Sequence, residues 1–141
     1  MTVHFPNGPV TGALADGTTF VLMARGVVVE GALLDLVDLA PSTICVEWST
    51  PRTVSYVTTG QFLDLWWTAR ADSALARFGL LSASLVRCEP IQLQLRQPRI
   101  VGSGLRWTVT DVRGSLPHES GACVLVINPP RGVERGVSSA G

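Results

Sequence analysis

Residues 26–67 constrain the fold more than any other part of this 141-residue chain. Three β-rich segments follow one another there, RGVVVEGALLDLVDL, STICVEWST and PRTVSYVTT, and Pro-containing turns separate them. β-Branched and aromatic residues favour strands, whereas Pro, Ser and Gly favour turns. The following segment, QFLDLWWTARADSALARF, changes to the 3.6-residue period of a helix. The region therefore predicts consecutive strands closed by one helix.

Two strands are expected in the first part of the chain. TTFVLMA, residues 18–24, reads as the first of them. Arg25 and Gly26 are expected to turn the chain into a longer strand over residues 27–39. Gly31 lies inside that longer strand, where a glycine marks a bulge or a tight bend of the kind small barrels use at their corners.

The next segment alternates between two faces. One face carries Ile44, Val46 and Trp48, and the other carries Cys45 and Glu47. Successive side chains of a strand point to opposite faces. We therefore expect Trp48 to anchor the core, as we do for Trp107 in a later alternating segment, and Glu47 to face solvent.

The helix is expected to span about residues 59–78. Thr58 and Gln61 have the spacing of a capping box, and Gly79 suits the residue that follows a helix. Apolar residues form two stripes, one with Phe62, Leu65 and Trp66 and one with Leu63 and Trp67. A helix that is apolar on two sides is either deeply buried or contacts a partner as well as its own core.

The second half of the chain supplies further strands. Residues 91–96 and 105–113 alternate, and the apolar residues 122–128 suit a central strand that is buried on both faces. In total, the sequence predicts about six or seven strands and one main helix. We expect a β-dominated α+β fold with antiparallel pairing in a partly closed small barrel. A loop segment at residues 1–17 would precede this single domain at 18–130, and a flexible tail at 131–141 would follow it.

The order of elements over residues 27–67 resembles SH3-like barrels. A bent strand is followed by a V-x-W strand, a short turn, one more strand and a helical closure. The resemblance covers less than a third of the chain, and what it implies is a barrel.

Charge is distributed unevenly along the chain. All eleven basic residues are arginine, and the net charge is zero. Residues 1–64 hold two arginines and six acidic residues, whereas residues 65–141 hold nine arginines and five acidic residues. This asymmetry is compatible with an Arg-rich binding face, with charge matching inside one chain, or with the two ends of a head-to-tail assembly contact.

Two strands of the second half place polar residues on one face if they pair. The residues are Gln92, Gln94 and Arg96 on one strand and Arg106, Thr108 and Thr110 on the other. Such a face suits phosphates or an acidic protein surface. Nucleic acid is therefore an alternative partner, with the candidate contacts Arg87, Arg96, Arg99, Arg106 and Arg113. Zero net charge and a pI of about 6.7 count against it.

Catalytic and metal-binding patterns are weak. The cysteines are three in number and widely spaced, without a zinc-ligand pattern, and Cys45 and Cys123 lie in apolar strand segments that suit buried thiols. His118 and Glu119 are neighbours in a polar loop, where a solvated pair is the plainer interpretation. We expect no metal and no cofactor, and the sequence favours a non-enzymatic function without deciding it. An alternative is a small-ligand or enzymatic barrel with Trp48, Glu47 or His118 at its mouth.

The expected location is the cytoplasm. No apolar run approaches the roughly 20 residues of a membrane-spanning helix, and MTVHFPNGPVTG has neither the basic nor the apolar region of a signal peptide.

The function most consistent with these features is non-enzymatic binding or assembly through protein–protein contacts. The partner would be another protein or a second copy of this chain, and the size and composition suit an accessory or structural protein of a phage or plasmid. The expected interface residues are Leu63, Trp66, Trp67, Arg96 and Arg106.

Overall fold

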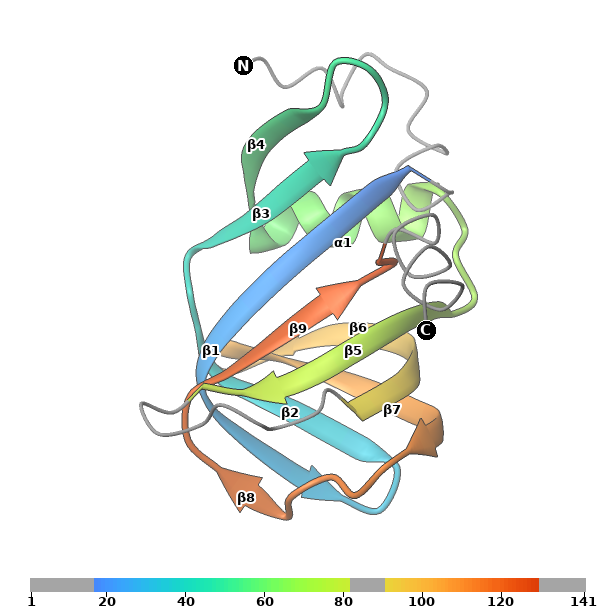
Figure 1. Cartoon of the computed structure of the whole chain (residues 1–141). Helices are drawn as coiled ribbons and strands as arrows, with labels where there is room; N and C mark the ends of the chain where they lie inside the picture. The colour runs from blue at the N-terminus through green and yellow to red at the C-terminus, as the bar shows by residue number, and fades with distance from the viewer. Residues whose placement is uncertain (1–16, 82–90, 130–141) are drawn as a thin grey trace.

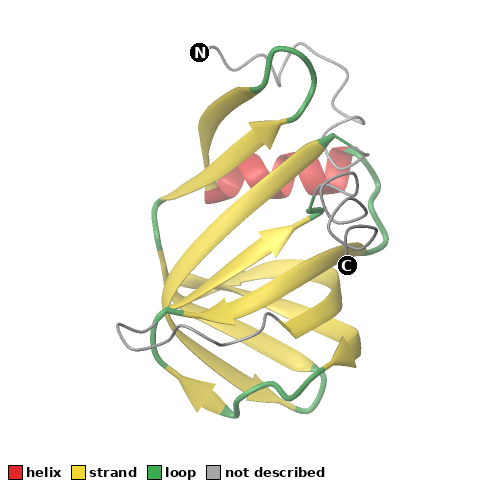
Figure 2. Ribbon diagram, in the orientation of Figure 1, coloured by secondary structure: helices red, strands yellow, loops and turns green. Residues whose placement is uncertain are grey.

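The computed structural model describes residues 17–81 and 91–129, which form nine strands and one helix. Figures 1 and 2 show a β-dominated molecule with a barrel below and a smaller strand-and-helix extension above it. The elements in chain order are β1 (Thr18–Glu30), β2 (Leu33–Leu39), β3 (Ser42–Glu47), β4 (Thr53–Thr58), α1 (Thr59–Thr68), β5 (Ala74–Leu80), β6 (Ile91–Val101), β7 (Gly104–Arg113), β8 (Glu119–Ser120) and β9 (Cys123–Ile127).

Six of the strands close into an antiparallel barrel. The hydrogen-bonded order is β1, β2, β7, β6, β5 and β9, and β9 pairs with β1 to complete the circuit. The expected β-dominated antiparallel barrel with one helix is confirmed, and the barrel is closed rather than partly closed. Closure removes the free strand edges that an open sheet would present at these positions.

Strand β1 belongs to both parts of the molecule. Its first residues, 18–21, pair with β3, and residues 24–30 pair with β2 along the same edge. The predicted turn at Arg25 and Gly26 is therefore wrong, because β1 runs straight through both residues. The chain turns at Gly31 instead, whose φ of 59° lies in the left-handed region that glycine adopts without a steric penalty.

Aromatic side chains join the helix to the barrel. The ring centroids of Phe20 on β1 and Phe62 on α1 are 5.0 Å apart, and those of Trp66 on α1 and Trp107 on β7 are 5.2 Å apart, both in edge-to-face geometry. All four side chains are fully buried. The helix thus packs its buried face against the interior of the barrel, and the expected core position of Trp107 is confirmed.

The start of the helix follows the sequence pattern. The Thr58 hydroxyl accepts a hydrogen bond from the backbone N–H of Gln61 at 3.1 Å, and the Gln61 side chain accepts one from the backbone N–H of Thr58 at 2.8 Å. This reciprocal pair is the predicted capping box, and it satisfies two backbone donors that the first helical turn leaves free.

The end of the helix differs from the prediction. Helix α1 stops at Thr68, and Arg70 takes the left-handed conformation with φ 57°. The N–H of Arg70 donates to the carbonyl of Trp67, and the N–H of Ala71 donates to the carbonyl of Trp66. These two bonds make a Schellman motif, in which glycine usually occupies the left-handed position. An arginine there gave no sequence signal for the end of the helix.

Part of the predicted helix is a strand. Residues 74–80 form β5, with Ala74, Ala76 and Phe78 buried in alternation. The segment contains good helix formers, but it fills the gap between β6 and β9, where a period of two buries its apolar residues. Tertiary pairing overrides local propensity at this point.

The predicted core face of β3 is also reversed. Thr43 and Cys45 are buried, whereas Ile44, Val46 and Trp48 lie on the outer face and are only half-buried. Helix α1 contacts β3 and β4, and it covers the face that the sequence pattern assigned to solvent.

Some expectations lie outside the described residues. They are the loop segment before Gly17, the tail at residues 131–141, and the candidate nucleic-acid contact Arg87.

Two adjacent tryptophans allow a direct test of this core. Trp66 is fully buried and Trp67 is 53% exposed. We expect Trp66→Ala to lower the free energy of unfolding by about 3–5 kcal/mol, because it removes a large side chain from a packed cluster. Trp67→Ala should cost less than about 1 kcal/mol. Urea unfolding followed by circular dichroism measures both, and equal losses would contradict this packing.

Candidate interaction surfaces

Pairing of β6 with β7 creates a polar outer surface. Arg96 lies opposite Thr108, Gln94 lies opposite Thr110, and Arg99 lies opposite Arg106. Directly opposed residues of antiparallel strands share a face. The expected polar sheet face is therefore present, and it is called the Arg face below: Gln92, Gln94, Arg96, Arg99, Arg106, Thr108, Thr110 and Arg113.

One arginine of the Arg face is held by a carboxylate from the other half of the chain. The Nε of Arg106 donates to Oδ1 of Asp35 at 2.7 Å, and its Nη2 donates to Oδ2 at 2.9 Å. This hydrogen bonding and the charge of Asp35 raise the pKa of Arg106 above its ordinary value. The acidic first half and the Arg-rich second half of the sequence thus meet within one chain at this point.

The same ion pair reduces a repulsion between like charges. Arg99 and Arg106 are direct cross-strand neighbours, an arrangement that destabilises a sheet when both charges are unpaired. The Asp35 carboxylate neutralises Arg106, and Arg99 and Arg96 remain exposed beside it.

A polar hollow lies at one border of the Arg face. Its volume is about 240 Å³, and its lining residues are Leu75, Gln92, Gln94, Asp111, Val112 and Arg113. Asp111 has φ 50°, and β7 carries an extra residue here relative to β6. Such a bulge redirects side chains, and it brings a carboxylate, two amides and a guanidinium around one small space.

A second outer surface is apolar. In one row across the sheet, Val21 on β1 is opposite Ile44 on β3, which is opposite Tyr56 on β4. In the next row Val46 is opposite Val54. This surface is called the hairpin face below, and it comprises Val21, Met23, Ile44, Val46, Val54 and Tyr56.

The hairpin face becomes more exposed toward its edge. Val21, Ile44 and Val46 are half-buried, whereas Val54 is 49% and Tyr56 is 64% exposed. Sequence reasoning missed this surface because TVSYVT has apolar residues on both faces of β4. Helix α1 covers the face of β4 that carries Ser55 and Val57. The position of the helix therefore decides which face of β4 points outward.

The turn between β3 and β4 is tied to the start of β1. The indole N–H of Trp48 donates to the Thr19 hydroxyl at 2.9 Å, and the guanidinium carbon of Arg52 lies 5.3 Å from the centroid of the Trp48 ring. A cation over an aromatic face is attracted by the ring electrons. These contacts fix the outer end of the hairpin relative to the barrel.

The expected interface residues of the helix separate into two groups. Trp66 is buried in the aromatic core, which excludes it from direct contact with a partner of the folded chain. Leu63 is half-buried against the core, and Trp67 is exposed. Of the three helical residues expected at an interface, Trp67 is therefore the one whose side chain is exposed.

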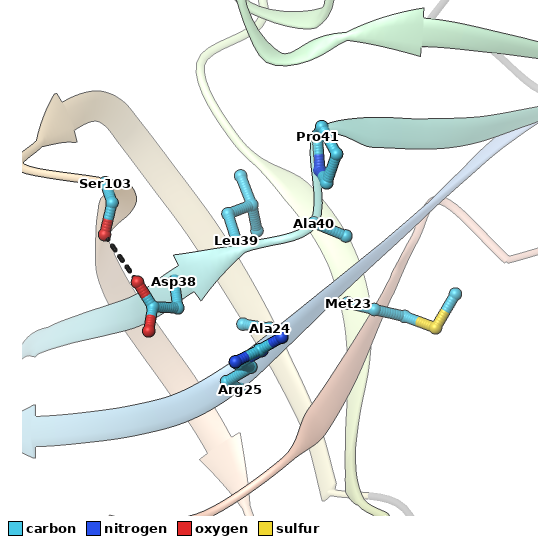
Figure 3. Close-up of a pocket in the computed structure, with 8 residues that line it drawn as sticks. All are labelled: Met23, Ala24, Arg25, Asp38, Leu39, Ala40, Pro41 and Ser103. Carbon is cyan, nitrogen blue, oxygen red and sulfur yellow. Dashed lines mark hydrogen bonds between the residues drawn. The ribbon is translucent and has the colours of Figure 1, made fainter.

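A larger hollow lies where β2 leaves β1 (Figure 3). Its volume is about 480 Å³, and it is lined mainly by apolar residues between Met23 and Pro41. Asp38 and Ser103 join across one side of it by a hydrogen bond of 2.9 Å. Arg25 supplies the cationic group of this hollow.

Three residues proposed for the mouth of an enzymatic barrel do not converge. Glu47 and Trp48 lie beside the first residues of β1, whereas His118 bonds the backbone of Val29 near the other end of that strand. About ten residues of β1 separate these places, or roughly 30 Å measured along the strand at the usual rise per residue. Within residues 17–81 and 91–129, no group of three or more His, Cys, Asp or Glu side chains is placed to hold a metal ion.

The two described cysteines are buried thiols. Burial raises the pKa of Cys45 and of Cys123 to about 11. A thiol with so high a pKa carries little thiolate at neutral pH, and thiolate is the nucleophilic form. Both residues therefore fill the core, as the sequence indicated.

Comparison with known proteins found no match to any protein-family model, any curated protein or any solved structure. In the part of the chain that the structure describes, no helix has the length and apolar character needed to cross a membrane.

The Asp35–Arg106 pair leads to a test by double substitution. We expect Asp35→Asn to lower the free energy of unfolding at low salt, because Arg106 then faces Arg99 without its carboxylate. The loss should be smaller at high salt and smaller in an Arg99→Gln background. Chemical unfolding of the four variants measures this coupling, and a loss independent of Arg99 would contradict the proposed relief of repulsion.

Proposed function

We propose that this protein is a non-enzymatic binding or assembly protein that acts through protein–protein contacts. The hairpin face is the observation that carries the proposal. It is contiguous across β1, β3 and β4, none of its six residues is charged, and two of them are about half exposed or more. Contiguous apolar patches on a protein surface mark sites of interaction.

Tyr56 is the strongest contact residue within this face. It is the most exposed large apolar side chain in the described part of the chain. Tyrosine is enriched among the residues that dominate binding energies, because it combines a large apolar area with a polar end. Trp67 on α1 is a second exposed aromatic residue and supports the same kind of function.

A second copy of the chain is the simplest partner, and assembly of copies suits a structural or accessory protein of a phage or plasmid. We place such a protein in the cytoplasm. The two buried thiols support that location, since free cysteines persist in reducing compartments.

The proposal is tested by a native mass spectrum of the protein purified at low salt. We expect a discrete oligomer or a stable protein complex, which a Met23→Ser/Tyr56→Ser variant should lose. Val37→Ser/Ile100→Ser is the matched control, because Val37 and Ile100 are 41% and 58% exposed while Met23 and Tyr56 are 37% and 64% exposed. A bare monomer of 15.0 kDa for the unchanged protein, even at concentrations well above the micromolar range, would contradict the proposal.

Nucleic-acid binding is the second candidate function, and the Arg face supports it. Arg96, Arg99 and Arg113 are exposed on one face of the β6–β7 pair. Arg106 lies on the same face and is paired with Asp35. Guanidinium groups bind phosphates in a two-pronged geometry. Binding of this kind depends steeply on salt, because each neutralised phosphate releases counterions.

A salt titration tests this second function. If it holds, single-stranded or duplex DNA binds at 50 mM salt, and Arg96→Gln/Arg99→Gln lowers both the affinity and the salt slope. Arg25→Gln, which removes an exposed arginine on β1, should leave both unchanged. Fluorescence anisotropy measures the affinities, and no binding at low salt would eliminate nucleic acid as a partner.

A further inference from the structure

Among the described residues, strand β4 lies at an edge of the sheet. The strand order ends at β4, and its only strand partner in the described part of the chain is β3. Every second backbone group of an antiparallel strand points away from its partner, so the outer side of β4 presents N–H and C=O groups that no strand among the described residues pairs with. Helix α1 leaves the end of β4 and passes behind β1 in the view of Figure 1, so it does not run along this edge.

This edge lacks the usual protection against pairing. Natural edge strands carry charges, prolines or bulges that prevent another strand from adding to them. The residues of β4, TVSYVT, include no charged residue and no proline, and all six of them pair with β3 without a register shift. An uninterrupted, neutral edge of this kind is a template for a further strand.

We propose that β4 pairs antiparallel with β4 of a second copy of this chain, so that two sheets join across a two-fold axis. The inference rests on the proposed assembly function and names its partner and its contact. In the proposed register Ser55 lies opposite the partner's Ser55. Val54 of each copy then lies opposite Tyr56 of the other copy, so the two-fold axis produces this pair twice.

Self-complementarity argues for a second copy as the occupant of this edge. Directly opposite residues must share a face of the joined sheet, and in this register Val54 and Tyr56 meet on the exposed outer face of both copies. An aromatic residue opposite a β-branched residue is a favourable cross-strand pair. No charge on one β4 opposes a like charge on the other, because the strand has none.

The size of the contact indicates a reversible dimer. Stable interfaces bury about 1,200 Å² or more in total, and two six-residue strands with two Val–Tyr pairs are a small contact by that standard. The joined outer surface consists of both hairpin faces in one continuous sheet. We therefore expect a dimer whose population depends on concentration in the micromolar range.

Cross-linking tests the register. In a Cys88→Ala background, which keeps the buried Cys45 and Cys123, the variants Val54→Cys and Tyr56→Cys are oxidised separately and as an equimolar mixture. Only the mixture should form a disulfide-linked dimer, because residues 54 and 56 are opposite whereas identical residues are diagonal and too far apart for a disulfide. A cross-link in Tyr56→Cys alone, or none in the mixture, overturns this register.

Charge at the edge tests the contact itself. Val54→Lys should raise the dimer dissociation constant at least about tenfold, because a lysine at an edge opposes pairing. Ile100→Lys is the matched control, as Ile100 is 58% and Val54 is 49% exposed, and it should leave the constant unchanged. Sedimentation equilibrium measures both variants, and circular dichroism checks that both remain folded.

The outcomes separate this inference from the proposed function. An oligomer that neither cross-links in the mixture nor responds to Val54→Lys overturns the β4 contact and leaves the assembly function standing. A monomer without a bound partner overturns both. A monomer whose β4 amides are protected from hydrogen exchange means that another part of the same chain covers the edge, and this also overturns pairing between copies.

Discussion

The arrangement of this molecule depends on one long strand. β1 has 13 residues and pairs with β2 and β3 along one edge and with β8 and β9 along the other. Residues 20–30 of β1 take part in the barrel through their pairing with β9 and β2, and residues 18–21 also carry the β3–β4 hairpin on the edge opposite β9. Because Phe20, Leu22 and Ala24 alternate inward along it, the same strand fixes which side of the hairpin faces α1 and which side faces outward. The hairpin face is thus a consequence of the way β1 is shared.

Closure of the barrel requires a close approach between β2 and β7. A Cβ atom at Gly104 would collide with the backbone carbonyl of Leu36, so only glycine allows the two strands to meet there. Gly104 precedes Leu105, which is buried and pairs with Leu36. The pairing of β2 with β7 also places Arg106 opposite Asp35, so the ion pair of the Arg face follows from the same register. Steric fit inside the barrel and charge pairing outside it are set by one strand alignment.

The features that sequence reasoning predicted correctly are those encoded locally. The capping box of Thr58 and Gln61 needs residues three apart, and the strand character of β6 and β7 follows from alternation between neighbouring residues. The features that it missed depend on distant parts of the chain. The end of α1 uses a left-handed arginine, residues 74–80 become a strand because two strands flank them, and the outward side of β3 is decided by the helix that covers the other side. Alternation shows that two faces differ, but it does not show which face a distant element will cover.

The distribution of charge gives the two outer surfaces a different chemical character. The Arg face brings arginines together, and Asp35 neutralises one of them within the chain, so the face keeps a positive charge from its other arginines. The hairpin face and the β4 edge carry no charge. A charged edge would repel an identical copy near a two-fold axis, because each charge lies close to its own equivalent, whereas the uncharged β4 strand pairs with itself without that cost. The charged residues of the hairpin, Glu47 and Arg52, lie outside β4, so in the proposed dimer the two β4 strands meet without a contact between like charges.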